Sequence, residues 1–204
     1  MKKDVTKPLY DFDKNVLYEF NVAFAGMDEV GRGPLCGPVV VAAVVMPLDD
    51  YIEGVNDSKK ISEKKRIALA EQIKSKALAY VIAEADNNEI DEINILAATK
   101  KCMKECVERL KDKIGLCLVD TVSFDSPVKL YSLIKGDATS YSIACASIVA
   151  KVYRDELMYE YDKIYPGYGF ASNKGYGTAE HLKAIQEKGL TPIHRKTFTK
   201  NFVK

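Results

Sequence analysis

The chain has 204 residues, 47% of them hydrophobic, and its 30 Lys and Arg are balanced by 29 Asp and Glu, for a formal net charge of +1. This composition excludes a disordered polyelectrolyte, supplies material for a substantial core, and removes overall charge as an argument for nucleic-acid binding. The sequence has no apolar run of about 18 residues, no secretory signal and only five irregularly spaced cysteines. We therefore expect a cytoplasmic protein without a disulfide framework.

The hydrophobic periodicity predicts strands and helices that alternate along the chain. Short apolar runs bounded by polar residues predict strands at 22–27, 38–46, 78–85, 116–119 and 130–134. Apolar residues three and four apart predict a helix beginning at Ser62 and further helices at 95–110, 140–161 and 178–188. The small apolar residues at 143–150 predict a helix buried in the centre of the molecule. Together these elements indicate an α/β fold with a mixed sheet, in which the first strands could pair as hairpins.

The expected organisation has three parts. They are an N-terminal extension at 1–21, a main body at 22–160, and a basic helical segment at 161–204 packed on the same domain. Residues 171–204 carry seven Lys and Arg against two Glu, a net charge of +5. Such a segment could follow phosphates, although a solvated helix face is the commoner cause of this bias.

Acidic residues stand at the ends of predicted core elements. Asp28 and Glu29 follow the first strand, Asp120 follows the strand at 116–119, and Asp137 precedes the buried helix. Clustered carboxylates repel one another, and a divalent cation such as Mg²⁺ removes the repulsion. Two such ions about 3.5–4 Å apart can activate water and stabilise the leaving oxygen of a phosphoryl displacement. The sequence leaves open whether the four acids meet or are separate turn and cap residues.

Two glycine-flanked segments could contact a sugar or a phosphate. Gly31-Arg32-Gly33 follows the first strand, but Pro34 and the strand after it exclude a dinucleotide-binding fold. Its glycines permit positive φ and close backbone approach, either to a ligand or within an ordinary tight turn. Tyr176 stands between two glycines, beside Lys174, where it could stack on a sugar or base or fill a loop.

The cysteines and histidines form no recognisable zinc or catalytic motif. Cys102 and Cys106 lie on an apolar helix stripe and Cys145 lies in the buried helix, so we expect core thiols. His181 and His194 stand near no serine or cysteine nucleophile signature, which argues against a hydrolytic triad.

The motifs taken together resemble the ribonuclease HII family, the type 2 ribonucleases H. Residues 25–38 closely resemble the opening motif of that family. Further matches follow in family order at 57–60, 118–120, 135–137, 142–155, 173–178 and 191–195. The resemblance runs from about residue 22 to residue 198 and leaves 1–21 outside.

This resemblance implies a ribonuclease H-like fold, with a mixed central sheet flanked by helices and a C-terminal helical segment. It implies a cytoplasmic, monomeric endonuclease of ribonucleotide excision repair with no membrane partner. Such an enzyme hydrolyses the RNA strand of RNA–DNA hybrids and cuts on the 5′ side of ribonucleotides in duplex DNA. The expected products carry 3′-hydroxyl and 5′-phosphate ends.

The resemblance also assigns roles to residues. Four acids match the family's metal-binding carboxylates one by one and would hold two divalent ions, Mg²⁺ or Mn²⁺: Asp28, Glu29, Asp120 and Asp137. The loop Gly31-Arg32-Gly33 matches the turn that reads the 2′-hydroxyl, and Tyr176 matches the tyrosine that packs on the adjacent sugar. Three lysines are candidates for phosphate contacts: Lys59, Lys151 and Lys174.

The sequence departs from the family pattern at a few positions. Thr121 stands where the family usually has glycine, so the loop there could be displaced, and Asp125 becomes a minor rival for a place near the metal. Val30 and Cys36 replace alanines.

Two other functions remain in view. A non-catalytic binder of RNA–DNA junctions would gain nothing from acids facing phosphates. A nuclease of the same fold acting on other substrates, such as branched DNA, would not need the pairing of the glycine loop with Tyr176.

Overall fold

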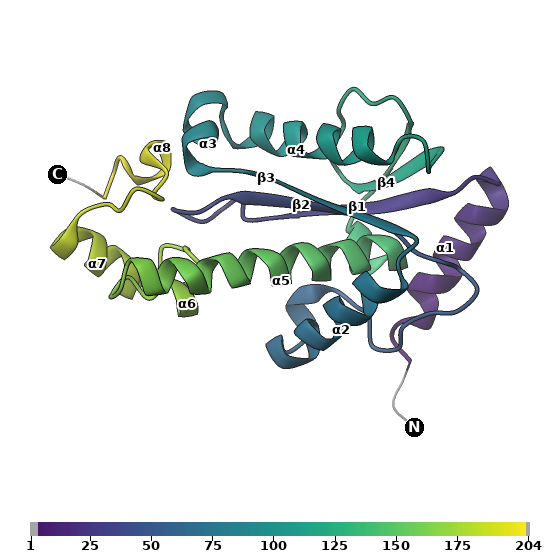
Figure 1. Ribbon diagram of the computed structural model, residues 1–204, viewed down its shortest axis with the longest axis horizontal. Helices are drawn as coiled ribbons and strands as arrows, with labels where there is room; N and C mark the ends of the chain where they lie inside the picture. Colours follow the sequence, from purple (N-terminus) through teal and green to yellow (C-terminus); the bar gives the residue numbers. More distant parts are fainter. Residues whose placement is uncertain (1–3, 203–204) are drawn as a thin grey trace.

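The computed structural model describes residues 4–202 and shows a five-stranded mixed sheet between two layers of helices (Figure 1). The order of the strands across the sheet is β3 (Ala79–Ala85), β2 (Val39–Val45), β1 (Phe24–Val30), β4 (Leu116–Asp120) and β5 (Lys129–Leu133). The first three strands pair antiparallel, whereas β1, β4 and β5 run parallel. The predicted α/β fold with a mixed sheet is therefore confirmed.

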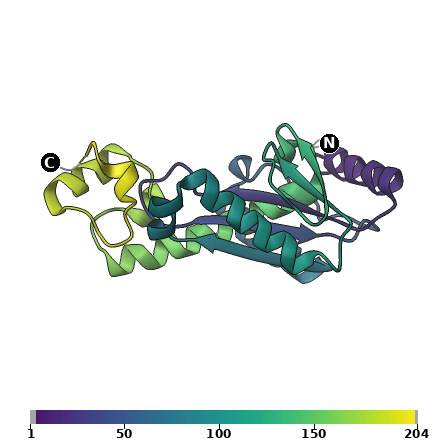
Figure 2. The ribbon, with the colours of Figure 1, turned by 90° about the horizontal axis from the view of Figure 1, so that it is seen from above.

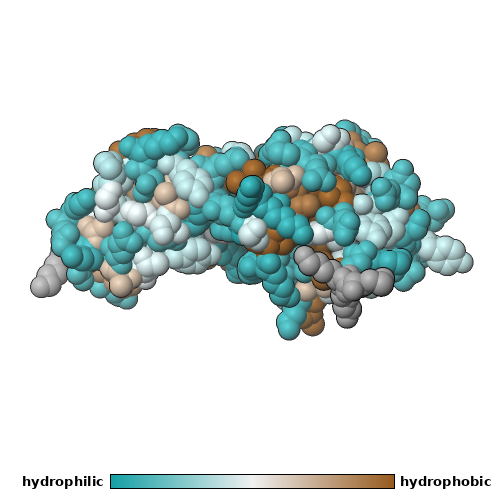
Figure 3. All heavy atoms as spheres, turned by 90° about the horizontal axis from the view of Figure 1, so that it is seen from below, coloured by the Kyte–Doolittle hydropathy of each residue, from teal (hydrophilic) through white to brown (hydrophobic). Residues whose placement is uncertain are grey.

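Each face of the sheet is covered by helices. The face below the sheet in Figure 1 packs against α5 (Tyr141–Ile164), with α2 (Glu63–Lys76) outside it. The face above packs against α4 (Ile95–Leu110), which follows the short α3 (Asn87–Ile93). All seven residues of β2 are buried because both of its faces are covered. Seen from the α2–α5 side, the surface is mainly hydrophilic, with apolar residues gathered near its middle (Figure 3).

Helix α5 is the central element that the sequence predicted. All of its residues from 141 to 150 are buried. It approaches β1 closely because Gly26 has no side chain; a Cβ there would lie 2.1 Å from the carbonyl carbon of Ser142. This close crossing fixes the height of α5 above the sheet.

The N-terminal segment forms a helix that the sequence analysis did not predict, α1 (Lys7–Phe20). Its buried Asp13 accepts a hydrogen bond from the amide of Ser142 at 2.7 Å, and Ser140 caps the same helix end through the amide of Ile143. Carboxylates at helix N-termini satisfy free amides and complement the helix dipole. Burial nevertheless raises the pKa of Asp13 to about 6. Helix α1 therefore secures the start of α5.

The C-terminal elements gather at the end of the molecule opposite α1 (Figure 2). They are α6 (Phe170–Asn173), α7 (Ala179–Lys188) and α8 (Lys196–Thr199). Their apolar residues, among them Phe170 and Ile185, pack on Met158 near the end of α5 and on Leu35. The 160/161 boundary of the expected organisation falls inside α5, so this helix spans both parts.

Strand β1 is longer than the sequence predicted. It continues through Val30, and Asp28 and Glu29 pair within the ladder with Ala42 and Val41 of β2. The five cysteines are buried free thiols, which confirms the core role expected for three of them. Among residues 4–202, no helix has the length and apolar content that a bilayer crossing requires.

Candidate active site

The parallel strands bring the four predicted acids to one edge of the sheet. Asp28 and Glu29 lie near the carboxyl end of β1, and Asp120 is the last residue of β4. Because Met27 pairs with Val119, Asp120 follows directly beside Asp28. Asp137 lies in the short helix η2 (Gly136–Ala138) that follows β5, and a Cβ on Gly136 would lie 3.4 Å from the Cβ of Asp120. Ligands of open α/β sheets bind at this carboxyl edge.

Successive residues of a strand point to opposite faces, so the acids surround the end of β1. Asp28 shares a face with its partner Ala42, on the α5 side, where the nearby Ser147 hydroxyl lowers its pKa. Glu29 lies on the α4 side and lines a cavity of about 430 Å³ together with Asp120 and Lys100. The two acids of β1 therefore face opposite sides of the sheet, and the cavity lies on the Glu29 side.

Burial and mutual repulsion perturb these carboxyl groups. Burial raises the pKa of Asp28 to about 7, and the charge of Glu29 adds to the effect. Burial also raises the pKa of Glu29, although Arg32 and Lys59 oppose the shift. The pKa of Asp137 is raised by burial and then by the charge of Asp57. Such shifts show that burial, and then the neighbouring acids, disfavour the ionised carboxylates, an effect that a bound cation would oppose.

The donor set fits a hard divalent cation. One oxygen of Glu29, Oε1, pairs with Arg32 at 3.2 Å, whereas the buried Oε2 has no hydrogen-bond partner in the described chain. No three acids among residues 4–202 place carboxylate oxygens within 4.8 Å of one another. The four carboxylates therefore do not converge on one point in this structure, and a fit to Mg²⁺ depends on the waters that this ion retains.

The glycine loop and Tyr176 meet beside the acids, although Gly33 and Tyr176 are 143 positions apart in the sequence. A Cβ on Gly33 would lie 3.5 Å from Cε1 of Tyr176, and the amide of Leu35 donates to the carbonyl of Gly175 at 2.8 Å. Gly31 has φ +95°, and a Cβ there would lie 2.3 Å from Nε of Arg154. Tyr176 is 47% exposed, so its ring does not fill the loop and is available to a ligand.

Comparison with known proteins identifies this arrangement. Residues 25–201 match the family model for ribonuclease HII. The chain belongs to the ribonuclease HII family. It is 52% identical over 195 residues to the ribonuclease HII of Caldanaerobacter subterraneus subsp. tengcongensis, covering 95% of this chain and 81% of that relative.

Solved structures share the fold. The ribonuclease H2 of Pyrococcus horikoshii superposes with a TM-score of 0.75 at 23% identity, covering 88% of this chain and 96% of that one. Bst-RNase HIII, solved in complex with Mn²⁺, gives 0.62 at 20% identity, covering 82% of this chain and 63% of that one. The protein is thus a metal-dependent endonuclease of the ribonuclease HII family, which acts on the RNA of RNA–DNA hybrids.

The three predicted lysines occupy different surroundings in the structure. Lys59, in the short helix η1 (Ser58–Lys60), lies close enough to the acids to lower the pKa values of Glu29 and Asp137. Lys151 pairs with Asp155 at 2.6 Å. Lys174 lies 3.5 Å from the ring centre of Tyr159 and donates to a backbone carbonyl. The structure thus brings Lys59 to the acids, whereas Lys151 and Lys174 have partners of their own.

The structure shows how Thr121 is accommodated next to Asp120. Thr121 has φ +55°, the left-handed conformation that favours the glycine usual in the family. Its hydroxyl donates to Oδ1 of Asp120 at 2.8 Å, so the threonine adds a contact to an acid of the site. Asp125 is exposed, and it lies outside the cavity that Glu29 and Asp120 line.

Sequence reasoning missed two buried arginines, Arg154 and Arg195. Neither forms an ion pair with a carboxylate in the described chain; instead both donate to backbone carbonyls of residues 31–38, and Arg154 also to that of Lys174. Their only signal in the sequence is their place in the motifs at 142–155 and 191–195.

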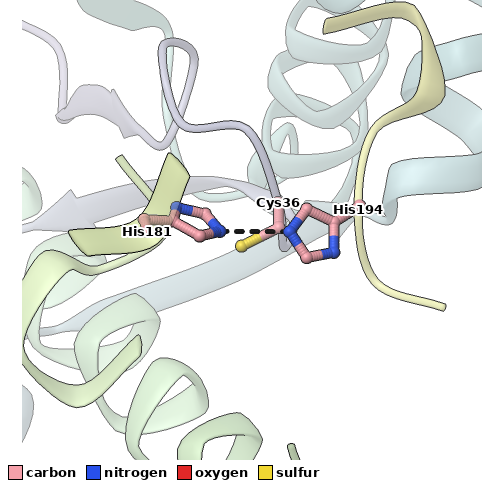
Figure 4. A group of neighbouring side chains, drawn as sticks. All are labelled: Cys36, His181 and His194. Atoms are coloured by element: carbon pink, nitrogen blue, oxygen red, sulfur yellow. Dashed lines mark hydrogen bonds between the residues drawn. The ribbon is translucent and has the colours of Figure 1, made fainter. Parts of the chain in front are cut away.

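A second cluster was also missed. Cys36, His181 and His194 come from three distant segments and place their donor atoms within 4.8 Å of one another, all buried (Figure 4). Nε2 of His181 and Nε2 of His194 are 3.0 Å apart.

Proposed function

We propose that the enzyme cuts on the 5′ side of ribonucleotides embedded in duplex DNA, as well as the RNA of hybrids. Two divalent cations, Mg²⁺ or Mn²⁺, would be held by four acids: Asp28, Glu29, Asp120 and Asp137. The products would carry 3′-hydroxyl and 5′-phosphate ends.

One observation carries this proposal: the acids adjoin a surface suited to a sugar. Only Val30 separates Glu29 from the loop Gly31-Arg32-Gly33, and Tyr176 lies against Gly33. A substrate whose phosphate approaches the acids would therefore place a sugar near the loop and the tyrosine. Since the 2′-hydroxyl distinguishes RNA from DNA, such a contact provides a basis for choosing the ribonucleotide.

Two of the four acids have a hydroxyl neighbour on the chain itself. Ser147 lies near Asp28, and its hydroxyl is 2.9 Å from that of Ser58, which joins α5 to the segment that carries Lys59. Thr121 holds Oδ1 of Asp120. When bound here, divalent cations neutralise the charge of the scissile phosphate and lower the pKa of the attacking water. Lys59 adds a positive charge for the phosphate of the same strand.

Cleavage of defined duplexes tests the proposal. One duplex contains a single ribonucleotide, a second has an RNA strand, and an all-DNA duplex is the control, each with Mg²⁺ or Mn²⁺. We expect a single cut 5′ of the ribonucleotide, a product that ligase can use at its 3′-hydroxyl, and no cleavage of DNA. Cleavage of the hybrid alone would refute the embedded-ribonucleotide activity, and equal cleavage of DNA would refute sugar recognition.

A further inference from the structure

Arg195 determines how the glycine loop presents its backbone. The guanidinium is fully buried and makes five hydrogen bonds to four carbonyls, those of Gly31, Arg32, Pro34 and Gly37, at 2.6–3.1 Å. Five donors is the full capacity of an arginine side chain. The loop carbonyls are therefore turned inward, toward one fixed group.

Because the loop carbonyls point toward Arg195, the amides that follow them point away from it. In a planar trans peptide the C=O and the next N–H point in opposite directions, and the described chain has no cis peptide. With the carbonyls of Gly31 and Arg32 directed at Arg195, the amides of Arg32 and Gly33 face away from it. Both residues are exposed, and within residues 4–202 neither amide donates a hydrogen bond. These two donors are free for a ligand's hydroxyl oxygen.

The histidine pair, His181 and His194, contacts the backbone of Tyr176. Nδ1 of His194 lies 2.8 Å from the amide nitrogen of Thr191, which donates to it, so the proton of neutral His194 is on Nε2. That Nε2–H donates to Nε2 of His181 at 3.0 Å, which leaves the proton of His181 on Nδ1. His181 Nδ1–H in turn donates to the carbonyl of Tyr176 at 2.9 Å. The chain of bonds ends on the backbone of the tyrosine.

The same tautomers argue against a metal at this cluster. A histidine that binds a metal through Nε2 carries its proton on Nδ1 and donates it to an acceptor. At His194, Nδ1 instead accepts from the amide of Thr191 at 2.8 Å, and the hydroxyl of the same residue also lies 2.8 Å away. The cluster is thus a hydrogen-bonded relay packed among the rings of Tyr168 and Phe170.

We propose that Arg195 and His181 are the positioning residues of ribonucleotide recognition. Arg195 turns the amides of Arg32 and Gly33 toward the 2′-hydroxyl, and His181, oriented by His194, holds Tyr176 against the neighbouring sugar. This inference rests on the proposed function, because it assumes that the loop and Tyr176 contact the substrate.

Sugar discrimination can be measured by binding alone. In an Asp120→Asn background, which removes cleavage, the readout is the ratio of Kd for an all-DNA duplex to Kd for the same duplex with one ribonucleotide. A general loss of structure weakens both affinities and leaves the ratio unchanged. We expect Arg195→Lys to lower the ratio about fivefold, since a lysine cannot hold all four carbonyls and one directed hydrogen bond is lost.

Double variants with Tyr176→Ala distinguish the effect of Arg195 on the glycine loop from the effect of His181 on Tyr176. His181→Leu and Tyr176→Ala should each lower the ratio about fivefold, and the double variant no further, because His181 acts through the tyrosine. The effects of Arg195→Lys and Tyr176→Ala on the ratio should instead multiply, because the two residues act on different parts of the surface. His181→Asn, which keeps a donor at the position of Nδ1, should recover most of the loss. Cys36→Ala is the matched control beside the same histidines and should leave the ratio unchanged.

Several results would overturn the inference. They are an unchanged ratio in folded Arg195→Lys, multiplying effects of His181→Leu and Tyr176→Ala, or stoichiometric zinc in the purified protein that Cys36→Ala removes. An unaltered ratio in Tyr176→Ala also overturns it. Cleavage by the enzyme with Asp120 intact, and its loss in Asp120→Asn, are scored separately, so the proposed nuclease function can stand while this inference fails.

Discussion

Gly26 offers a severe test of the packing that builds the site. Replacing it with alanine places a Cβ 2.1 Å from the carbonyl carbon of Ser142 and 2.3 Å from the amide nitrogen of Ile143. An ordinary contact begins at 3.4 Å, so α5 must withdraw by about 1.3 Å, the difference between the two distances. The neighbours are backbone atoms and cannot rotate away. We expect Gly26→Ala to cost about 3 kcal/mol, the upper part of the usual range for overpacking.

Thermal unfolding measures this cost directly. For a chain of this length, about 3 kcal/mol corresponds to a fall in Tm of about 6–12 °C. Activity should also fall at temperatures where the variant is folded, because Ser147 withdraws from Asp28 together with α5. Gly33→Ala is the matched control: its Cβ would meet only the Tyr176 ring, at 3.5 Å, so Tm should stay within about 2 °C. A drop smaller than about 2 °C for Gly26→Ala would refute the close crossing.

Three further predictions concern the site and its support. Asp120→Asn should reduce cleavage at least about a hundredfold without lowering Tm, and retention of a tenth of the wild-type rate in Mg²⁺ would contradict its role. Thr121→Gly should raise the free energy of unfolding by about 0.5–1 kcal/mol in urea titrations, because it relieves the positive φ; a loss of stability would show that the hydroxyl contact to Asp120 outweighs the strain. Burial lowers the pKa of His194 to about 4. Its contribution to stability is therefore full above the unfolded value of about 6.5 and is lost as pH falls toward 4, by about 2 kcal/mol at pH 5. His194→Gln should flatten that part of the pH profile, and parallel profiles would argue against a buried neutral histidine.

Local patterns predicted most of the elements. The helix at 95–110 has the bounds that its apolar stripe indicated, and Thr178 and Gly189 flank α7 as cap and stop. Helix α1 was missed because the resemblance begins after it. Its buried Asp13 accepts a hydrogen bond from Ser142, which is 129 positions away in the sequence. The pattern of residues within α1 does not indicate such a distant partner.

The residues around the candidate site also fall into a group that the sequence could name and a group that it could not. The four acids, the glycine loop and Tyr176 could be named from residue types and motif order, since their positions after strands and between glycines are visible along the chain. Arg195 and the histidine pair could not, because a buried arginine that binds carbonyls 158–164 residues away looks in sequence like any surface cation.

The sequence by itself determined the α/β class and the buried character of α5, and it supplied the candidates for the chemistry, because those depend on residue type and on spacing within one element. Only the tertiary structure decided that the acids share one edge. That outcome depends on β1, β4 and β5 running parallel, which places carboxyl ends from distant parts of the chain together. It also decided the direction of the loop amides, since a peptide plane is oriented by whatever binds its carbonyl, and here that partner is Arg195.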